Sequence, residues 1–371
     1  MLSVFSAPSH YVQGKNATAA LGQEMKRLGL SGPALIVTGQ SAFRLLAEVW
    51  QKYLGESGIS HAVYHFGGEC CYPEIERIKE AARANKSRVI IGAGGGKILD
   101  AVRAAADDLN LPVVNCPTVA SSDAPCSALS VIYTEDGVFQ EYRFYRKNPD
   151  LVLVDTQVVA KAPPRLLVAG MGDALATWFE AKTCVDGHIR NMRGGRSTRS
   201  AETLAELCYR TLIEDGPDAL RAVQTQVVNP ALERLVEANT LLSGLGFESS
   251  GLAAAHAVHN GLTAAPPTHA YYHGEKVAYG LMTQLVLEGK PRSVIDPVLT
   301  FASAVGLPIT LAEVGLANLS HEMLEQIAIR ATAEGETIHN EPFEVTPDMV
   351  ADAILAADAM GREWKARAAQ R

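Results

Sequence analysis

Three residues in the second half of the chain have side chains that commonly bind metal ions. Asp173 lies in AGMGDALATWFEA, His256 in GLAAAHAVHNGL and His273 in YYHGEKVAYG. One carboxylate and two imidazoles, with a fourth position left open, are typical of a catalytic zinc ion. A lone histidine on an apolar helix is more often a hydrogen-bonded core residue, so spacing alone leaves both interpretations open. His259, on the same helix face as His256, is either a further ligand or a partner of one.

A glycine-rich segment in the first half has the composition of a phosphate-binding turn. Gly92–Asp100 reads GAGGGKILD and follows the β-branched run Val89–Ile91. Glycine lets the backbone approach a ligand closely, and the start of a helix offers N–H groups to an anion. The spacing is neither G-x-G-x-x-G nor that of a Walker A loop. We expect this strand, turn and helix to bind a nucleotide phosphate, the alternative being a tight connection with no ligand.

Hydroxyl and carboxyl side chains gather in a later loop. Pro117–Ser127 reads PTVASSDAPCS and contains Thr118, Ser121, Ser122 and Asp123. These groups are able to hydrogen-bond a cofactor or a polyol. Ser and Asp also favour such loops for their turn chemistry, so that structural interpretation stays open.

Strand and helix signals alternate in the first half of the chain. Strands are expected at Ala34–Thr38, Ala62–Phe66, Arg88–Ile91, Pro112–Asn115 and Leu151–Asp155, and helices at Ser41–Gly55, Glu74–Ala84 and Ala101–Leu109. This alternation predicts a parallel sheet with helices on both faces. Asp136–Arg146, with Gly137 at its turn, predicts a hairpin.

The pattern becomes helical after the pair Pro163-Pro164, which suits a domain boundary. Helices are expected at Ala201–Ile213, Pro230–Leu242, Gly251–Leu262, Lys276–Leu287 and Thr346–Ala366. Two glycines precede Asp173, so we expect that residue at the start of a helix, and His273 at the start of another. The sequence therefore predicts an α/β domain over 1–162 and an all-helical domain over 163–371.

The composition restricts the class of protein. The chain has 371 residues, 47% of them hydrophobic, and a net charge of −8. No basic block is present, so nucleic acid is not an expected partner. No apolar run reaches the length of a membrane span, and the N-terminus lacks the pattern of a signal peptide. Six cysteines are too few for a disulfide scaffold, which favours reduced thiols in the cytoplasm.

The longer motifs together resemble the glycerol dehydrogenases of the metal-dependent, iron-type alcohol dehydrogenase superfamily. The segments that carry the resemblance cover nearly the whole chain: Gly92–Asp100, Pro117–Thr134, Asn148–Thr156, Gly170–Ala181, Asn229–Ala264, His273–Gly280 and Ala333–Asn340 (AEGETIHN). The resemblance implies a Rossmann-like N-terminal domain and an all-α C-terminal domain, in the architecture of dehydroquinate synthase. It also implies an enzyme that oxidises glycerol to dihydroxyacetone with NAD.

The resemblance assigns roles to individual residues. It implies one zinc ion per chain, held by Asp173, His256 and His273, and a substrate contact at Asp123, so that Asp123 and His256 serve catalysis. The implied cofactor contacts are Gly94, Gly95, Gly96, Lys97, Thr118, Ser121, Ser127, Leu129 and Tyr133. It further implies a homo-octamer of cytoplasmic subunits acting on small polyols, without nucleic acid or membrane.

Two positions depart from the pattern of the superfamily. Iron-dependent members carry a histidine four residues after the aspartate, where this chain has Thr177, which favours zinc over iron. Glycerol dehydrogenases usually have an aspartate after the first strand, where this chain has Gly39-Gln40. The carboxylate that would repel the 2′-phosphate of NADP is therefore missing, and we expect NAD with weakened rejection of NADP.

Two other functions are alternatives to an NAD-dependent glycerol dehydrogenase. A lyase resembling dehydroquinate synthase would share the architecture, NAD and zinc, but would be expected to use Glu as the acidic ligand and many basic residues around its substrate. A non-catalytic protein that binds metal and nucleotide is the second. The presence of both the three candidate metal ligands and the glycine-rich cofactor turn counts against a non-catalytic protein.

Overall fold

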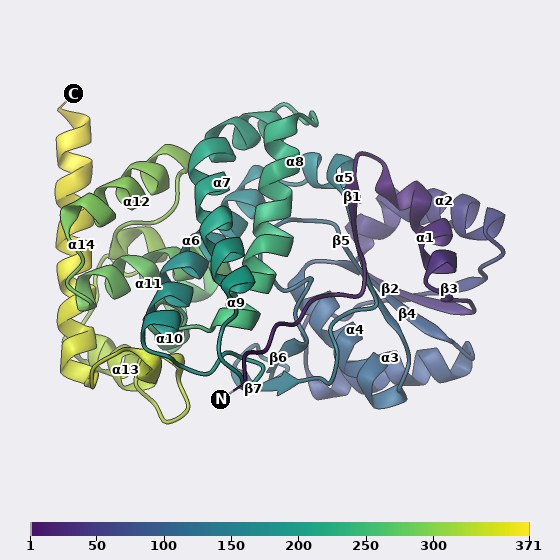
Figure 1. Ribbon diagram of the computed structural model, residues 1–371, viewed down its shortest axis with the longest axis horizontal. Coiled ribbons are helices and arrows are strands. Elements are labelled where there is room, and N and C mark those ends of the chain that lie inside the picture. Colours follow the sequence, from purple (N-terminus) through teal and green to yellow (C-terminus); the bar gives the residue numbers. More distant parts are fainter. Residues whose placement is uncertain (1, 371) are drawn as a thin grey trace. The chain divides into compact units, whose positions relative to one another are not determined.

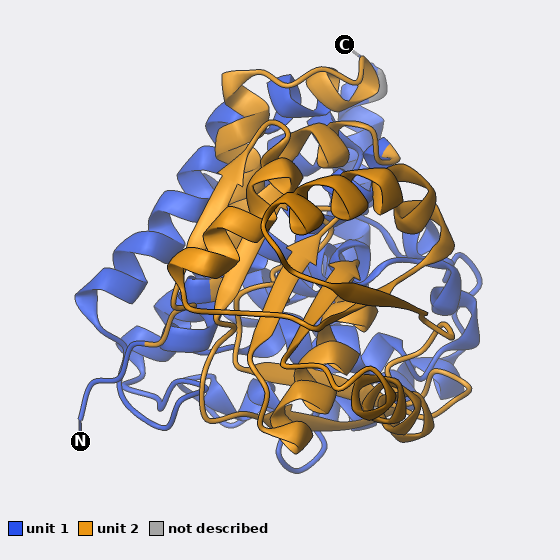
Figure 2. Cartoon of the chain, turned by 90° about the vertical axis from the view of Figure 1, so that its right-hand side faces the viewer, with its two compact units in different colours: residues 1–5, 164–220, 245–371 blue, residues 6–163, 221–244 orange. Residues whose placement is uncertain are grey.

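The computed structural model describes residues 2–370 and divides into two compact units (Figure 2). The α/β unit comprises Ser6–Pro163 and Arg221–Gly244, and the helical unit comprises Met1–Phe5, Pro164–Leu220 and Leu245–Arg371. These units differ from the domains expected from the sequence at residues 1–5, 163 and 221–244, each of which groups with the other half.

A parallel sheet forms the centre of the α/β unit (Figure 1). Within the described residues it has six strands in the order β1-β8-β5-β4-β2-β3: β1 (Tyr11–Gly14), β2 (Ala34–Thr38), β3 (His61–His65), β4 (Val89–Gly94), β5 (Val113–Pro117) and β8 (Leu151–Asp155). β2, β4, β5 and β8 are buried along their whole length, which accounts for their almost continuous apolar runs. β1 was not predicted, because its sequence YVQG is short and only partly buried.

Helices connect the successive strands from β1 to β5, as the alternation predicted, and two more helices of this unit follow β8. They are α1 (Leu21–Arg27), α2 (Gln40–Glu56), α3 (Tyr72–Ala84), α4 (Gly96–Leu109), α5 (Thr156–Ala160) and α8 (Pro230–Glu237), with the short turns η1 (Ala17–Ala20) and η2 (Ala238–Leu242). The hairpin consists of β6 (Leu129–Tyr133) and β7 (Phe139–Phe144), so its first strand precedes the predicted segment. Gly137 lies in its turn with φ +83°, a conformation that favours glycine.

The strand order diverges between β2 and β4, because the strands that follow them in the chain lie on opposite sides of this pair. The two strands are neighbours, with Thr38 opposite Ala93. α2 leads from β2 to the edge strand β3, whereas α4 leads from β4 to β5 on the other side. Open parallel sheets bind ligands outside the strand ends at such a divergence. Gly39 and the turn Gly94–Gly96 lie at this position.

The helical unit contains the longer helices of the second half. They are α6 (Pro164–Asp186), α7 (Arg199–Gln224), α9 (Ser243–Ser250), α10 (Ala254–Leu262), α11 (His273–Leu287), α12 (Arg292–Val305), α13 (His321–Ala331) and α14 (Pro347–Ala369), with the turns η3 (Pro266–Ala270), η4 (Leu311–Val314) and η5 (Thr337–Asn340). The end of α7 from Arg221 and the start of α9 up to Gly244 belong to the α/β unit. His273 does begin a helix, as expected, but Asp173 lies in the middle of α6 and not at a helix start. No helix among the described residues is long and apolar enough to cross a membrane.

Glycines bring three of these helices into backbone contact. A Cβ atom on Gly172 of α6 would lie within 3.0 Å of the carbonyl of Gly274 in α11, and one on Gly274 would collide with the carbonyl of Ala169. In the same way, a Cβ atom on Gly280 of α11 would collide with the carbonyl of Ala255 in α10. Gly172 therefore permits close helix packing, and it does not mark a helix start.

We predict that Gly280→Ala destabilises the protein by about 1–3 kcal/mol or more, because α10 and α11 must move apart to admit one methyl group. Gly55→Ala is the control. This glycine lies in α2 with no atom within 4 Å of its would-be Cβ, so alanine should stabilise by about 0.5–1 kcal/mol. Urea unfolding of both variants checks this, and equal effects would contradict the packing argument.

Candidate metal centre and cofactor turn

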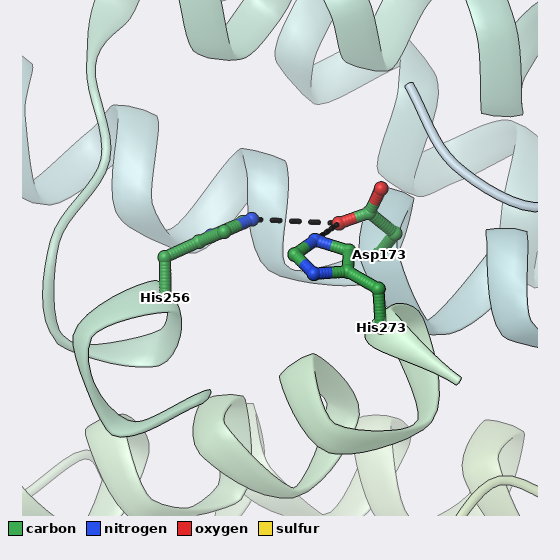
Figure 3. A group of neighbouring side chains, drawn as sticks. All are labelled: Asp173, His256 and His273. Atoms are coloured by element: carbon green, nitrogen blue, oxygen red, sulfur yellow. Dashed lines mark hydrogen bonds and ion pairs between the residues drawn. The ribbon is translucent and has the colours of Figure 1, made fainter. Parts of the chain in front are cut away.

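Asp173, His256 and His273 come together from three helices of the helical unit. Figure 3 shows both imidazoles pointing toward the carboxylate of Asp173. Oδ1 of Asp173 lies 3.1 Å from Nε2 of His273 and 3.4 Å from Nε2 of His256. One ligand atom from each residue lies within 4.8 Å of the others. In a tetrahedral zinc site, bonds of about 2.0–2.2 Å place ligand atoms roughly 3.4 Å apart, so the distances from Asp173 to the two histidines fit such an ion.

The charges at this centre are buried and depend on one another. Asp173 is fully buried, and burial opposes its ionisation, but His273 and His256 outweigh that effect and hold the pKa of Asp173 well below its ordinary value. Burial also opposes protonation of His256, yet the carboxylates of Glu180 and Asp173 raise the pKa of His256 well above its ordinary value. The centre therefore attracts positive charge, which a proton or a metal cation is able to supply.

Glu180 holds the imidazole of His256 in place, and the sequence analysis did not identify it. Its Oε2 lies 2.6 Å from Nδ1 of His256, and its Oε1 accepts the backbone N–H groups of Ala253 and His256 at 2.9 and 3.0 Å. Glu180 thus caps the start of α10 from α6, seven residues beyond Asp173. With the Nδ1 proton directed at Glu180, Nε2 of His256 faces Asp173. In the sequence, the available signal for Glu180 was its presence in the same motif as Asp173, Gly170–Ala181.

His259 contacts the candidate ligand His273 and is not one of the three residues of the candidate metal group. Its Nε2 lies 3.0 Å from Nδ1 of His273, on the side of that ring away from Asp173. Among the described residues, the group that could hold a metal contains Asp173, His256 and His273 but not His259. Burial, His273 and Lys276 lower the pKa of His259 well below its ordinary value, which keeps its ring neutral.

The packing around Thr177 leaves little room for a fourth imidazole. Thr177 is fully buried one helical turn after Asp173. It lies against the backbone of Gly246 in α9, where an added Cβ would come within 2.7 Å of Cγ2 of Thr177. A larger side chain at 177 would therefore displace α9 on that side.

Two glycines of the turn between β4 and α4 have room for a side chain. A Cβ atom on Gly95 would meet Val119 at 3.5 Å and one on Gly96 would meet Ser122 at 3.5 Å, both ordinary contacts. Gly95 also has φ −88°, which any residue adopts. Neither packing nor backbone conformation requires glycine at these two positions. The bare backbone beside the first N–H groups of α4 fits a phosphate group.

The other predicted cofactor residues also lie in the α/β unit. Lys97 is in the first turn of α4, Thr118 and Ser121 follow β5, Ser127 precedes β6, and Leu129 and Tyr133 begin and end β6. The N–H of Thr118 donates to the carbonyl of Gly94 at 3.1 Å, so the two loops are adjacent. The Lys97 ammonium pairs with Glu69 at 2.6 Å.

Asp123 and the loop around it are held by contacts within the α/β unit. The hydroxyl of Ser243 donates to Oδ2 of Asp123 at 2.8 Å. Arg103, which sequence reasoning missed, donates to the carbonyls of Ala124 and Ser127 and pairs with Asp100. Arg103 and Asp100 lie three residues apart on α4, and in the sequence this spacing was the available signal for an ion pair between them.

Comparison with known proteins agrees with this geometry. Residues 8–156 match the family model described as iron-containing alcohol dehydrogenase. The chain is 51% identical to the glycerol dehydrogenase of Citrobacter freundii, covering 99% of this chain and 100% of that one. It is 48% identical to the glycolaldehyde reductase of Halobacterium salinarum, over 99% and 100% of the two chains. The crystal structure of glycerol dehydrogenase from Schizosaccharomyces pombe superimposes with a TM-score of 0.95 at 38% identity, covering 100% of this chain and 94% of that one.

Full-length similarity at this level extends over both units and includes every segment that carried the resemblance in the sequence. The chain therefore belongs to the iron-containing alcohol dehydrogenase family and is an oxidoreductase of its glycerol dehydrogenase group.

Proposed function

We propose that this chain oxidises glycerol, and related vicinal diols, to the hydroxyketone with NAD and one zinc ion. The observation that carries the proposal is the convergence of Asp173, His256 and His273 on one point with a spacing suited to a tetrahedral cation. Relatives named glycerol dehydrogenase support the substrate. The relative named glycolaldehyde reductase supports a substrate range that includes other small hydroxycarbonyl compounds.

Each part of the proposed site has its own task. Asp173, His256 and His273 would hold the zinc ion, and Asp123 would orient a substrate hydroxyl. Gly95 and Gly96 would allow the cofactor phosphates to approach the start of α4, with Gly94, Lys97, Thr118, Ser121, Ser127, Leu129 and Tyr133 as the remaining cofactor contacts. When bound, zinc supplies Lewis-acid polarisation of the substrate hydroxyls and NAD accepts the hydride.

Zinc is proposed over iron because of the residue at position 177. Thr177 offers no imidazole, and it is buried close to Gly246. Three protein ligands and an open position are the usual arrangement of a catalytic zinc ion. Assembly into a homo-octamer and a cytoplasmic location remain predictions from the sequence.

Steady-state formation of NADH from glycerol tests the function directly. We expect activity that a chelator abolishes and that added zinc restores better than ferrous iron does. A panel with 1,2-propanediol, glycolaldehyde and simple monohydric alcohols would define the substrate class. Equal activity toward monohydric alcohols would contradict selection of a vicinal diol, and activity that survives metal removal would contradict the role of zinc.

We predict that His256→Ala loses bound metal and activity together, because two remaining ligands do not hold the ion in the required geometry. His269→Ala is the matched control, since this histidine is exposed and its Nε2 lies 2.9 Å from the carbonyl oxygen of Thr263. Metal content by mass spectrometry and NADH formation are measured on both variants. An active His256→Ala enzyme with unchanged zinc content would refute the ligand assignment.

We predict that Gly39→Asp sharpens the preference for NAD over NADP. Gly39 caps α2 at the divergence of the sheet, with φ −82°, and an added Cβ would have only an ordinary 3.8 Å contact with Ile98. Aspartate therefore fits there, where it would accept the ribose hydroxyls and repel a 2′-phosphate. A contact to a charged group contributes about 1.5–3 kcal/mol, so the ratio of kcat/KM values for the two cofactors should rise on the order of tenfold or more. If the wild type already rejects NADP by thousands-fold, selectivity comes from elsewhere.

A further inference from the structure

One motif of the sequence, Ala333–Asn340, has no part in the proposed reaction, yet one of its residues is connected to the candidate metal centre. Glu336 lies just before η5 and is 8% exposed. Its Oε2 accepts a hydrogen bond from Nδ2 of Asn260 at 2.9 Å, and its Oε1 accepts one from Arg330. Asn260 is 5% exposed and follows His259 on α10.

A continuous series of hydrogen bonds leads from Glu336 to His273. The amide oxygen Oδ1 of Asn260 lies 3.0 Å from Nδ1 of His259. The other ring nitrogen of His259, Nε2, lies 3.0 Å from Nδ1 of His273. Nε2 of His273 in turn faces Asp173 at 3.1 Å.

The direction of every hydrogen bond in this series follows from its first member, Glu336. Glu336 pairs with Arg330, and an ionised carboxylate only accepts hydrogen bonds. The NH₂ group of Asn260 must therefore face Glu336, which turns its carbonyl oxygen toward His259. Nδ1 of His259 must then carry a proton.

The same reasoning continues from His259 to the metal centre. A neutral histidine with its proton on Nδ1 has a lone pair on Nε2, which accepts the Nδ1 proton of His273. His273 consequently holds a proton on Nδ1 and directs Nε2 at the position where a cation would bind. This assignment holds whether Nε2 of His273 carries a proton toward Asp173 or offers its lone pair to a metal.

We propose that Glu336 and Asn260 are positioning residues that fix the tautomer of His259, and through it the tautomer in which His273 binds the metal. The proposal rests on the metal centre of the proposed function and adds to it two residues that are not ligands. It also gives a physical reason for an acidic residue within the motif AEGETIHN.

Glu336→Gln should reverse the series of hydrogen bonds with almost no change in shape. Arg330 has only donors, so the carbonyl of the new glutamine would face Arg330 and its NH₂ group would face Asn260. Asn260 would then rotate, Nδ1 of His259 would have to accept, and Nε2 of His259 would donate to His273. His273 would be left with its proton on Nε2, toward the metal position. We expect metal affinity to fall about 10–100-fold.

Adding Asn260→Asp to Glu336→Gln should restore binding. Aspartate at 260 accepts both the NH₂ group of the new glutamine and the Nδ1 proton of His259, so the original direction returns. The double variant carries the same formal charge at this pair of positions as the wild type. A residue that served only for packing would not be rescued by a second substitution of this kind.

Glu341→Gln is the matched control for the single variant. Glu341 is close in sequence to Glu336 and also buried, and its Oε1 accepts the backbone N–H of Ala254, a contact that glutamine keeps. Burial and the neighbouring Glu288 raise the pKa of Glu341 to about 9. The side chain of Glu341 is therefore neutral at pH 7, as glutamine would be. Zinc affinity should stay within a factor of about two of wild type.

The measurement is zinc affinity of the metal-free proteins by competition with a chromophoric chelator, with thermal unfolding as a check on folding. Absence of zinc binding in the wild type would overturn the proposed function itself. Zinc binding in the wild type with unchanged affinity in Glu336→Gln would overturn the inference alone. Loss in the single variant without recovery in the double variant would also overturn the tautomer mechanism.

A second measurement determines the tautomer of His259 directly in the wild-type protein. In metal-free wild-type protein labelled with ¹⁵N-histidine, the ring nitrogens of His259 should show a protonated Nδ1 and an unprotonated Nε2. The resonance is assigned by its absence in His259→Gln. A His259 ring with its proton on Nε2 would refute the proposed direction of the hydrogen bonds.

Discussion

The contact between α6 and α11 is the constraint on which the candidate site depends. Gly172 and Gly274 bring the two helix backbones together, and each glycine is next to a candidate ligand, Asp173 or His273. The packing of Gly280 against Ala255 does the same for α11 and α10, beside His256. Three side chains from separate helices reach one point because the backbones that bear them touch at the adjacent residue. Ligand geometry is thus a consequence of helix packing.

Burial of two carboxylates gives this site its chemical character. Asp173 and Glu180 are both fully buried, and both face the ring of His256. Buried carboxylates are costly unless a positive charge compensates them. The two carboxylates raise the pKa of His256, so a proton on its ring would compensate them. A cation that binds there takes over the same electrostatic task.

Local sequence patterns predicted those strands and helices whose burial leaves a pattern in their own residues. Leu151–Asp155 was predicted with its observed bounds, because five buried residues in a parallel strand form an unbroken apolar run. β1 has no such run and was missed. Gly170 and Gly172 were interpreted as preceding a helix, but the reason for Gly172 is the carbonyl of Gly274, a hundred residues later. No local pattern reports such a contact.

The same distinction separates the ligands from the residues that support them. Asp173, His256 and His273 were identified by residue type and by resemblance, whereas Glu180 and Glu336 act through hydrogen bonds that only the folded chain reveals. For His259 the sequence offered two roles, and the 3.0 Å contact with Nδ1 of His273 selects the supporting one.

The interleaving of the two units along the chain also determines the order in which a ribosome supplies them. The α/β unit lacks its last segment until Gly244 has been made, and α8 in that segment supplies Glu233, which accepts from Thr156 and Gln13. His273 follows Asp173 by 100 residues, a delay of about 5–20 s at usual rates of synthesis. Until His256 has been made, the carboxylate of Asp173 has neither imidazole beside it, and until His273 has been made it has at most one. Completion of the metal centre is therefore a late event in the biogenesis of the chain, and a nascent chain that stalls before His273 carries an incomplete one.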